Sequence, residues 1–472
     1  MPFTMLRHDI EARRLAFSSA VLICLLLTAL PARCAPPEPL RIGLAELDVT
    51  PARPVHLINQ LKPKESEGVH HPLRAKALAF VGEGAMDTAI LIVFDGIGVP
   101  PQLTEQLRRR LSPKIAPDNL TICATHDHCA PHLTGLLPGI FGDPLPEEHL
   151  RRINEYTREL TAKLETAARL ALSDAKPRRL FKGRGKVSFA VNRRRVENGK
   201  WLGWGNNPDG AVDHNLPLLC IRELDGTAAA ILVSYACHNT SIGGRDFDNR
   251  ISGDWVGYAQ SAIEINHPGA LAFVALGCGG EARPNKHGGI DAAREFGSII
   301  SKEVTRVLDS GLRPISSPPN CQWATIPLSL GPPPEPDELR SISTGAPSAK
   351  SRSAKARGRL ASQALASAAP LELSLPYQVQ TWSFGKELSW VFLAGEVVVD
   401  YAHRIKRELG PTAWTIAYAN DLPCYIPSKR ILSEGGYEAD QSMAYYGKLQ
   451  SLLPSTEERI IAEVKRQLSA AR

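Results

Sequence analysis

Short apolar runs that alternate with long amphipathic patterns constrain the fold of this chain most. The runs that predict strands are 41–50, 89–96, 120–125, 228–237, 270–277, 387–395 and 412–420. The segments that carry the 3.6-residue apolar period of helices are 101–113, 147–175 and 294–311. This alternation predicts the α/β class, with a mixed, largely parallel sheet flanked by helices.

One stretch interrupts the alternation. Between residues 331 and 370, Pro, Ser, Ala and basic residues replace the apolar pattern. Because strand-like runs continue after it, we interpret this stretch as a partly helical surface connection and not as a domain boundary. With 472 residues, 43% hydrophobic and 22% charged, the chain is long enough for one large domain, which we place at residues 35–472.

The N-terminus has the pattern of an export signal. Basic residues precede an apolar run at 15–30, and a stretch of small residues that includes Cys34 follows. We predict a signal peptide over residues 1–34 and a periplasmic or extracellular mature protein. The alternative is an uncleaved anchor, although the apolar run is shorter than the roughly 20 residues that span a bilayer.

The charge distribution and the cysteine content argue against nucleic-acid binding and against a fold held by disulfides or by thiolate-bound zinc. The net charge of +6 is spread along the chain without a sustained basic run, so we expect no nucleic-acid partner. After cleavage seven cysteines remain, an odd number without CxxC spacing, which argues against a disulfide framework and against a thiolate zinc site. Most lie in apolar runs and are expected to be buried, whereas Cys129 and Cys424 adjoin candidate site residues.

Polar residues follow many of the predicted strands at the point where each strand ends. These residues are Asp95, His126, His128, His238, Glu281, Glu396, Asp421 and Tyr425. In open α/β sheets, ligands bind beyond the carboxyl ends of strands, because side chains and loops converge there. The sequence therefore predicts one shared site.

Two imidazoles and a carboxylate favour zinc with an open position for water or substrate. A zinc-bound water has a pKa of about 7, which makes hydrolysis the expected chemistry. Each residue taken singly also has a structural alternative as a hydrogen-bonded group. The HxH pair of His126 and His128 is more specific, since it can present one imidazole to a metal and the other to a substrate. We interpret His132 as a loop residue. The HxHxDH motif of metallo-β-lactamases is absent.

Many short motifs, in the same order, resemble the neutral, non-lysosomal ceramidase family of exported or membrane-associated zinc amidases. The motifs are RIGLAELDVTP, GVHHPLRAKALAF, ATHDHCAPH, NRR, AVDHNLPLLCIRELDG, SYACHNTSIGG, ISGDWVGY, GCGGEARPN, LAGE and ANDLPCYIPSKRILSEGGYEA. They cover most of the predicted mature chain, so the resemblance is more specific than any single motif.

The resemblance implies a Zn²⁺ cofactor and a role for individual residues. The implied metal ligands are His126, His238, Glu396 and Tyr425, with Tyr437 as the alternative tyrosine. His128 would face the substrate carbonyl and Arg193 would be a site arginine. The structural alternative for Arg193 is a surface or salt-bridged residue.

Three further residues enter as catalytic candidates. Glu281 and Asp254 could move the proton, although carboxylates in Gly-rich turns also bind backbone N–H groups. Arg283 stands where ceramidases carry a serine, and a guanidinium at that place could hold a substrate anion. The chain ends soon after the GGYEA motif, so the C-terminal β-sandwich-like domain of full-length ceramidases is not expected.

These observations predict an exported zinc-dependent hydrolase that cleaves the amide bond of a small-molecule or lipid-like N-acyl compound. One alternative is a non-catalytic, zinc-containing ligand-binding descendant, because the family serine is missing. Another is a hydrolase of esters or sugar N-acyl groups that uses the same site. Peripheral membrane contact is an open option for a chain that resembles this family.

Overall fold

A computed structural model describes residues 37–112, 114–345, 351–367 and 369–470. Residues Glu38–Arg472 form one compact unit. The predicted signal peptide at 1–34 and its cleavage site lie outside the described residues.

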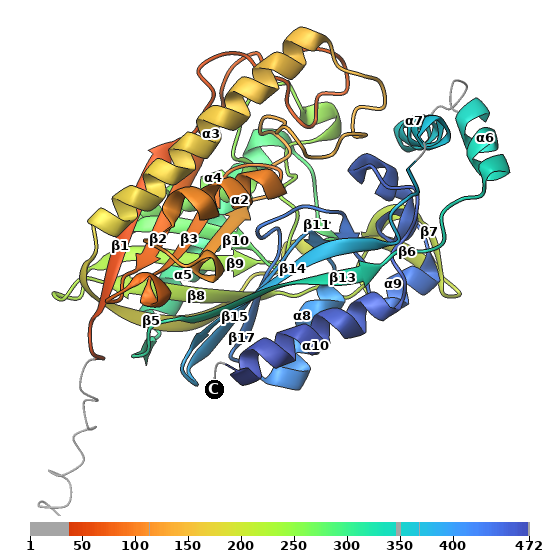
Figure 1. The fold of residues 1–472 in the computed structure, drawn as a ribbon. Coiled ribbons are helices and arrows are strands. Elements are labelled where there is room, and N and C mark those ends of the chain that lie inside the picture. The colour runs from red at the N-terminus through yellow and green to blue at the C-terminus, as the bar shows by residue number, and fades with distance from the viewer. Residues whose placement is uncertain (1–36, 113, 346–350, 368, 471–472) are drawn as a thin grey trace, which may run out of the picture. The chain divides into compact units, whose positions relative to one another are not determined.

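A large sheet runs through this unit (Figure 1). Its strands are, in spatial order, β10 (Leu271–Leu276), β9 (Ala228–Tyr235), β8 (Asn215–Arg222), β5 (Lys176–Lys186), β1 (Leu40–Asp48), β2 (Arg74–Phe80), β3 (Ala89–Phe94) and β4 (Leu120–Ala124), with β12 (Arg313–Ile315) paired to β5. The prediction of a mixed sheet flanked by helices is confirmed.

The expectation that this sheet is largely parallel is wrong. Only β10 with β9 and β3 with β4 pair in parallel, and the other described pairs of the sheet are antiparallel. Both faces of the sheet are covered, so its antiparallel strands are as continuously apolar as buried parallel strands. Apolar runs alone therefore could not reveal the strand direction.

The described residues form three smaller sheets as well. They are β13 (Asn320–Ser329), β14 (Ser374–Phe384), β15 (Leu388–Leu393) and β17 (Ala413–Ile416); β11 (Ala282–Pro284), β6 (Ala190–Glu197) and β7 (Lys200–Asn207); and β16 (Glu396–Val397) with β18 (Tyr425–Ile426). The first packs on one face of the large sheet, where Trp382 and Trp390 join a core with Phe80 and Leu219. The other two carry site residues.

Helices pack on the large sheet and on the sheet of β13 to β17, and two of them, within 331–370, pack mainly on each other. The helices are α2 (Pro101–Leu111), α3 (Glu147–Ser173), α4 (Asp254–Asn266), α5 (Gly289–Asp309), α6 (Pro336–Gly345), α7 (Arg352–Ala366), α8 (Val399–Leu409), α9 (Lys429–Glu434) and α10 (Ser455–Ala470). Figure 1 shows α2, α3 and α4 over the large sheet and α8 and α10 beside β13 to β17. Within the described ranges, none of these helices has the length and apolarity needed to span a bilayer.

The stretch 331–370 contains α6 and α7, in line with the expected partly helical connection. The seven cysteines between Cys123 and Cys424 are buried and free. This was expected for those in apolar runs, and it also holds for Cys129 and Cys424, which the sequence left open.

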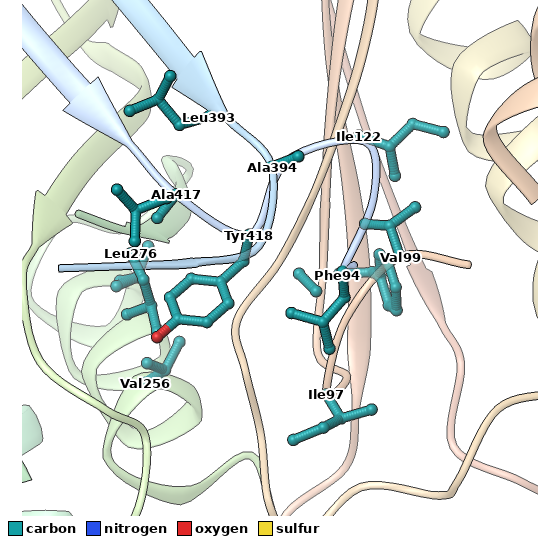
Figure 2. Close-up of a cluster of buried hydrophobic side chains, with 14 of the residues drawn as sticks. Phe94, Ile97, Val99, Ile122, Val256, Leu276, Leu393, Ala394, Ala417 and Tyr418 are labelled. Carbon is teal, nitrogen blue, oxygen red and sulfur yellow. The ribbon is translucent and has the colours of Figure 1, made fainter. Parts of the chain in front are cut away.

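Strand ends from the large sheet and from the sheet of β13 to β17 meet in one buried core (Figure 2). Phe94 and Ile122 come from β3 and β4, and Leu276 and Leu393 come from β10 and β15. Tyr418 follows β17 and reaches across this core toward α4. The core fixes the ends of strands from which the polar site residues emerge.

Candidate metal centre and active site

His126 leaves the end of β4 in a fixed orientation. Its backbone has a φ of 48°, in the left-handed region that residues other than glycine rarely adopt. Its Nδ1 lies 2.8 Å from the carbonyl oxygen of Ile97. A carbonyl only accepts hydrogen bonds, so Nδ1 carries the proton, and the lone pair of a neutral ring is on Nε2.

His238, which follows β9, is oriented in the same way. Its Nδ1 lies 3.0 Å from the carbonyl oxygens of both Gly279 and Ala282. Burial and the nearby charge of Arg193 lower the pKa of His238 to about 4, although Glu396 opposes this shift. The ring is therefore neutral near pH 7, with its lone pair on Nε2.

Glu396 lies between these two imidazoles. It begins β16, which pairs in parallel with β18 so that Glu396 is opposite Tyr425. Its Oε2 is 3.1 Å from Nε2 of His126 and 3.1 Å from Nε2 of His238. Burial opposes ionisation of Glu396, whereas positive charge at the position of the two Nε2 atoms would hold the pKa of this carboxyl well below its usual range.

This arrangement fits a bound cation. Two imidazole lone pairs face a carboxylate oxygen that is buried and receives no hydrogen bond from the described residues. Three acceptors at such distances repel one another unless a positive charge lies between them. Donor nitrogens of His126, His128 and His238 also lie within 4.8 Å of one another, so this triplet could hold a metal ion. Nitrogen and carboxylate oxygen are donors that suit zinc.

Tyr425 adds a hydroxyl to the same cluster. Its oxygen is 3.3 Å from Nε2 of His238 and accepts a hydrogen bond of 2.9 Å from Arg193. The ring of Tyr437 lies 5.5 Å from that of Tyr425. Of the two tyrosines that the sequence left open, it is Tyr425 whose hydroxyl contacts a candidate metal-binding histidine.

Arg193 is buried and paired, not a surface residue. Its Nε donates to Glu438 at 2.9 Å while its other arm reaches Tyr425. Its backbone N–H donates to the carbonyl of Glu281 at 2.9 Å. Arg193 therefore holds the hydroxyl of Tyr425, which also contacts His238.

His128 is the partly exposed member of the histidine triplet. Its Nε2 is 3.1 Å from Nε2 of His126. Burial, together with the neighbouring imidazoles, lowers its pKa well below the usual value. Because its ring is more accessible than those of His126 and His238, a molecule from solvent would meet His128 first.

The two carboxylates considered for proton transfer bind backbone amides. Asp254 accepts from Ser241 at 3.1 Å and from Ile242 at 2.9 Å, and burial raises its pKa to about 6. Glu281 accepts from the N–H of Val399 at the start of α8, and burial raises its pKa to about 8. These contacts match the structural alternative, and a catalytic role for either residue stays a prediction.

The other sequence candidates have different surroundings. Asp95 accepts from the N–H of Arg74, and Asp421 accepts from that of Leu422. His132 is buried and its ring lies 5.1 Å from that of Phe141. Within the described residues, none of these three side chains forms a hydrogen bond with the histidine triplet. Arg283 is half-buried on β11, beside the site.

Sequence reasoning missed three residues of the site. The hydroxyl of Tyr446 donates to Oε1 of Glu396. The ring of Tyr418 stacks on that of His126 with centroids 4.3 Å apart. Glu438 holds Arg193 and Arg194. Glu438 lies in the GGYEA motif and could have been found there, whereas the YY pair at 445–446 carried no signal.

The fold is similar to that of two solved structures. One is described as neutral ceramidase from Pseudomonas aeruginosa, with 17% identity, a TM-score of 0.67, and coverage of 91% of this chain and 74% of that chain. The other is described as ceramidase complexed with C2, with 17% identity, a TM-score of 0.65, and coverage of 91% and 76%. No protein-family model and no curated protein matches this chain. At this identity the likeness shows the fold, which agrees with the resemblance drawn from the motifs.

Proposed function

We propose that this protein is a zinc-dependent hydrolase that cleaves the amide bond of N-acyl compounds. The observation that carries the proposal is the convergence of His126 and His238 on one oxygen of Glu396, which no described hydrogen-bond donor satisfies. The similarity in fold to proteins described as ceramidases supports amides as the substrate class.

The residues that would hold zinc are His126, His238, Glu396 and Tyr425. Zinc, when bound, supplies a Lewis acid that polarises a carbonyl and acidifies water. The overall reaction adds the oxygen of water to the acyl carbon, breaks the C–N bond, and delivers a proton to the departing amine. The products are a carboxylic acid and an amine.

The remaining site residues bind and orient. His128 is accessible to a substrate, so its ring can donate a hydrogen bond to the amide oxygen as negative charge develops there. Arg193 positions Tyr425 through the hydrogen bond between them. The carbonyls of Ile97, Gly279 and Ala282 keep the tautomers of the two imidazoles that would bind zinc.

The test is hydrolysis of a panel of N-acyl compounds by the mature protein with zinc supplied. His126→Ala should abolish both zinc binding and hydrolysis, since it removes a ligand. His267→Ala is the matched control, because His267 contacts Thr305 and not the site. Hydrolysis that persists in His126→Ala after zinc is lost would contradict the proposed mechanism.

The same experiment separates the alternatives from the proposal. A protein that binds stoichiometric zinc but cleaves no member of the panel would be the non-catalytic descendant. The panel also contains esters and N-acyl sugars, which share the carbonyl group and differ in the leaving group. Preferential hydrolysis of one of these classes would identify an esterase or a sugar N-deacylase.

We also propose export, on the N-terminal pattern alone. Expression with residues 1–34 in a host that processes signal peptides should release a protein that begins at Ala35, which N-terminal sequencing identifies. An intact N-terminus on the secreted or membrane-bound protein would contradict cleavage at this position.

A further inference from the structure

Arg283 is a half-buried cation without an acidic partner. Its Nε is buried and has no hydrogen-bond partner among the described residues. Within the described residues, the guanidinium forms one hydrogen bond, of 3.0 Å, from Nη2 to the neutral side-chain oxygen of Asn206. Burial and the charge of Arg193 both lower the pKa of Arg283, so its surroundings add a second cation and no described anion. A guanidinium placed in this way lacks the counter-charge that partly buried cations normally have.

The neighbouring arginines show what is missing at Arg283. Arg193 and Arg194 on β6 are both paired with Glu438, and Arg194 also binds Glu434. Two carboxylates outside this three-stranded sheet, in the segment 434–438, thus pair with two of its arginines. Arg195 and Arg283 have no acidic partner among the described residues, but Arg195 is exposed to water whereas Arg283 is half-buried, so for Arg283 the anion has to come from elsewhere.

The sheet places Arg283 on the same side as the site. Arg283 on β11 lies opposite Val191 on β6. Directly opposite residues on adjacent strands share a face, and so do residues two apart on one strand, so Arg283 shares a face with Arg193. Arg193 in turn contacts Tyr425. The residue before Arg283 contributes the carbonyl that orients His238.

The rim of this face is accessible and aromatic. Trp204 on β7 is 52% exposed, and its ring lies 5.5 Å from the guanidinium of Arg193 and 4.8 Å from the ring of Tyr437. Asn206, two residues further along the same strand, is exposed and contacts Arg283. Asn206 thus links Arg283 to the strand that carries Trp204, whose ring approaches Arg193.

We propose that Arg283 is a specificity residue that binds an oxyanion carried by the substrate, so that this enzyme acts on anionic N-acyl compounds in preference to neutral ones. The inference rests on the proposed hydrolase function and narrows its substrate class. A carboxylate or a phosphate group fits, because a guanidinium donates paired N–H bonds to planar or tetrahedral oxyanions. Asn206 holds Nη2 of the guanidinium and Nε is shielded from solvent, so Nη1, which has no hydrogen-bond partner among the described residues, is the group left for the substrate.

The test compares matched substrates on the wild type and on Arg283→Met. The substrates are an N-acylglycine, its carboxamide, and an N-acylphosphoethanolamine with the same acyl chain. The wild type should prefer an anionic substrate in kcat/KM by roughly 10- to 100-fold, the range expected for hydrogen bonds to a charged group. Arg283→Met should lose that preference. If the wild type prefers the N-acylglycine, the recognised group is a carboxylate, and if it prefers the N-acylphosphoethanolamine, the recognised group is a phosphate.

A binding measurement keeps the two proposals distinguishable. Calorimetric titration of N-acylglycine into His126→Ala, with and without Arg283→Met, reports recognition without turnover. Lys286→Met is the matched charge control, because Lys286 is exposed and already paired with Glu295 at 2.7 Å.

Each outcome assigns the failure to one proposal. Hydrolysis of the carboxamide and the anionic compounds at equal rates would overturn the anion subsite and leave the hydrolase standing. Binding of N-acylglycine that depends on Arg283, without hydrolysis of any substrate, would overturn the hydrolase and leave the anion subsite standing. A preference that survives Arg283→Met, or that Lys286→Met removes, would also overturn the role of Arg283.

Discussion

At the scale of single residues, the site depends on two histidines, His126 and His238. Backbone carbonyls bind Nδ1 of each ring and so determine which ring nitrogen carries the proton. The sequence could indicate His126, His238 and Glu396, because each follows an apolar strand-like run. It could not indicate Tyr446 or Tyr418, because their contacts with Glu396 and His126 arise from loops distant in sequence. Such contacts depend on tertiary packing and leave no local pattern.

Tyr446 provides the first test at this scale. Its hydroxyl donates to the second oxygen of Glu396, so it orients a carboxylate that would bind zinc. Tyr446→Phe should weaken zinc binding by roughly 10- to 100-fold, the usual effect of losing such a partner. Competition with a chelator measures the change. Tyr445→Phe, next in the chain, should bind zinc like the wild type, and equal effects of both substitutions would contradict this role for Tyr446.

Glu281 gives a prediction for pH dependence. Burial raises its folded pKa from 4.5 to about 8, so the folded state holds the proton more tightly than the unfolded chain. The stability contributed by this proton is complete below about pH 4.5 and is lost as the pH rises to about 8. Glu281→Gln should remove that loss, with a gain relative to the wild type on the order of a few kcal/mol at pH 9. Denaturant unfolding at pH 5 and pH 9 measures it, and parallel pH dependences would contradict the prediction.

At the scale of elements, short pieces of backbone deliver the site, and these were the least predictable. The long helices α2, α3 and α5 lie where their apolar period placed them. The parallel pair of β16 and β18 consists of two residues each, too short to show any period, yet it places Glu396 opposite Tyr425. The apolar runs before Glu396 and Tyr425 indicated these two residues, whereas their role as metal ligands came from the resemblance to a family.

Gly395 tests the importance of that pair. It precedes Glu396 with a φ of 79°, and a Cβ at this position would lie 2.5 Å from the carbonyl oxygen of Cys424. Gly395→Ala should therefore destabilise the protein through both backbone strain and the clash, and should reduce its zinc content. Gly410→Ala is the control, since Gly410 also has a positive φ but open space around it. We expect Gly395→Ala to lower the free energy of unfolding by about 1–3 kcal/mol more than Gly410→Ala does. Equal losses in the two variants would contradict this account.

At the scale of the whole molecule, the site joins segments from most of the chain. His126, His238, Glu396 and Tyr425 come from different strands, and they meet only when the large sheet and the sheet of β13 to β17 have packed together. The α/β class and the shared site were predictable from strand ends. The mainly antiparallel order of the large sheet was not, because pairing direction depends on connections that apolar runs do not encode.

Zinc should therefore stabilise the fold as a whole. A ligand that binds only the folded state adds about 2.7 kcal/mol at a concentration of 100 times its Kd. The Tm of the mature protein should rise as zinc is added, and it should fall again when a chelator removes the metal. The same titration on His238→Ala should leave the Tm almost unchanged. A Tm that is insensitive to zinc in the wild type would contradict a folded-state metal site.

The most direct test of the central claim is the metal content of the purified mature protein. Elemental analysis of the wild type and of Glu396→Ala, prepared side by side with zinc supplied, should find close to one zinc per chain in the first and little in the second. A wild type that retains no zinc, or a Glu396→Ala variant that retains as much as the wild type, would contradict the metal centre on which the proposed hydrolysis depends.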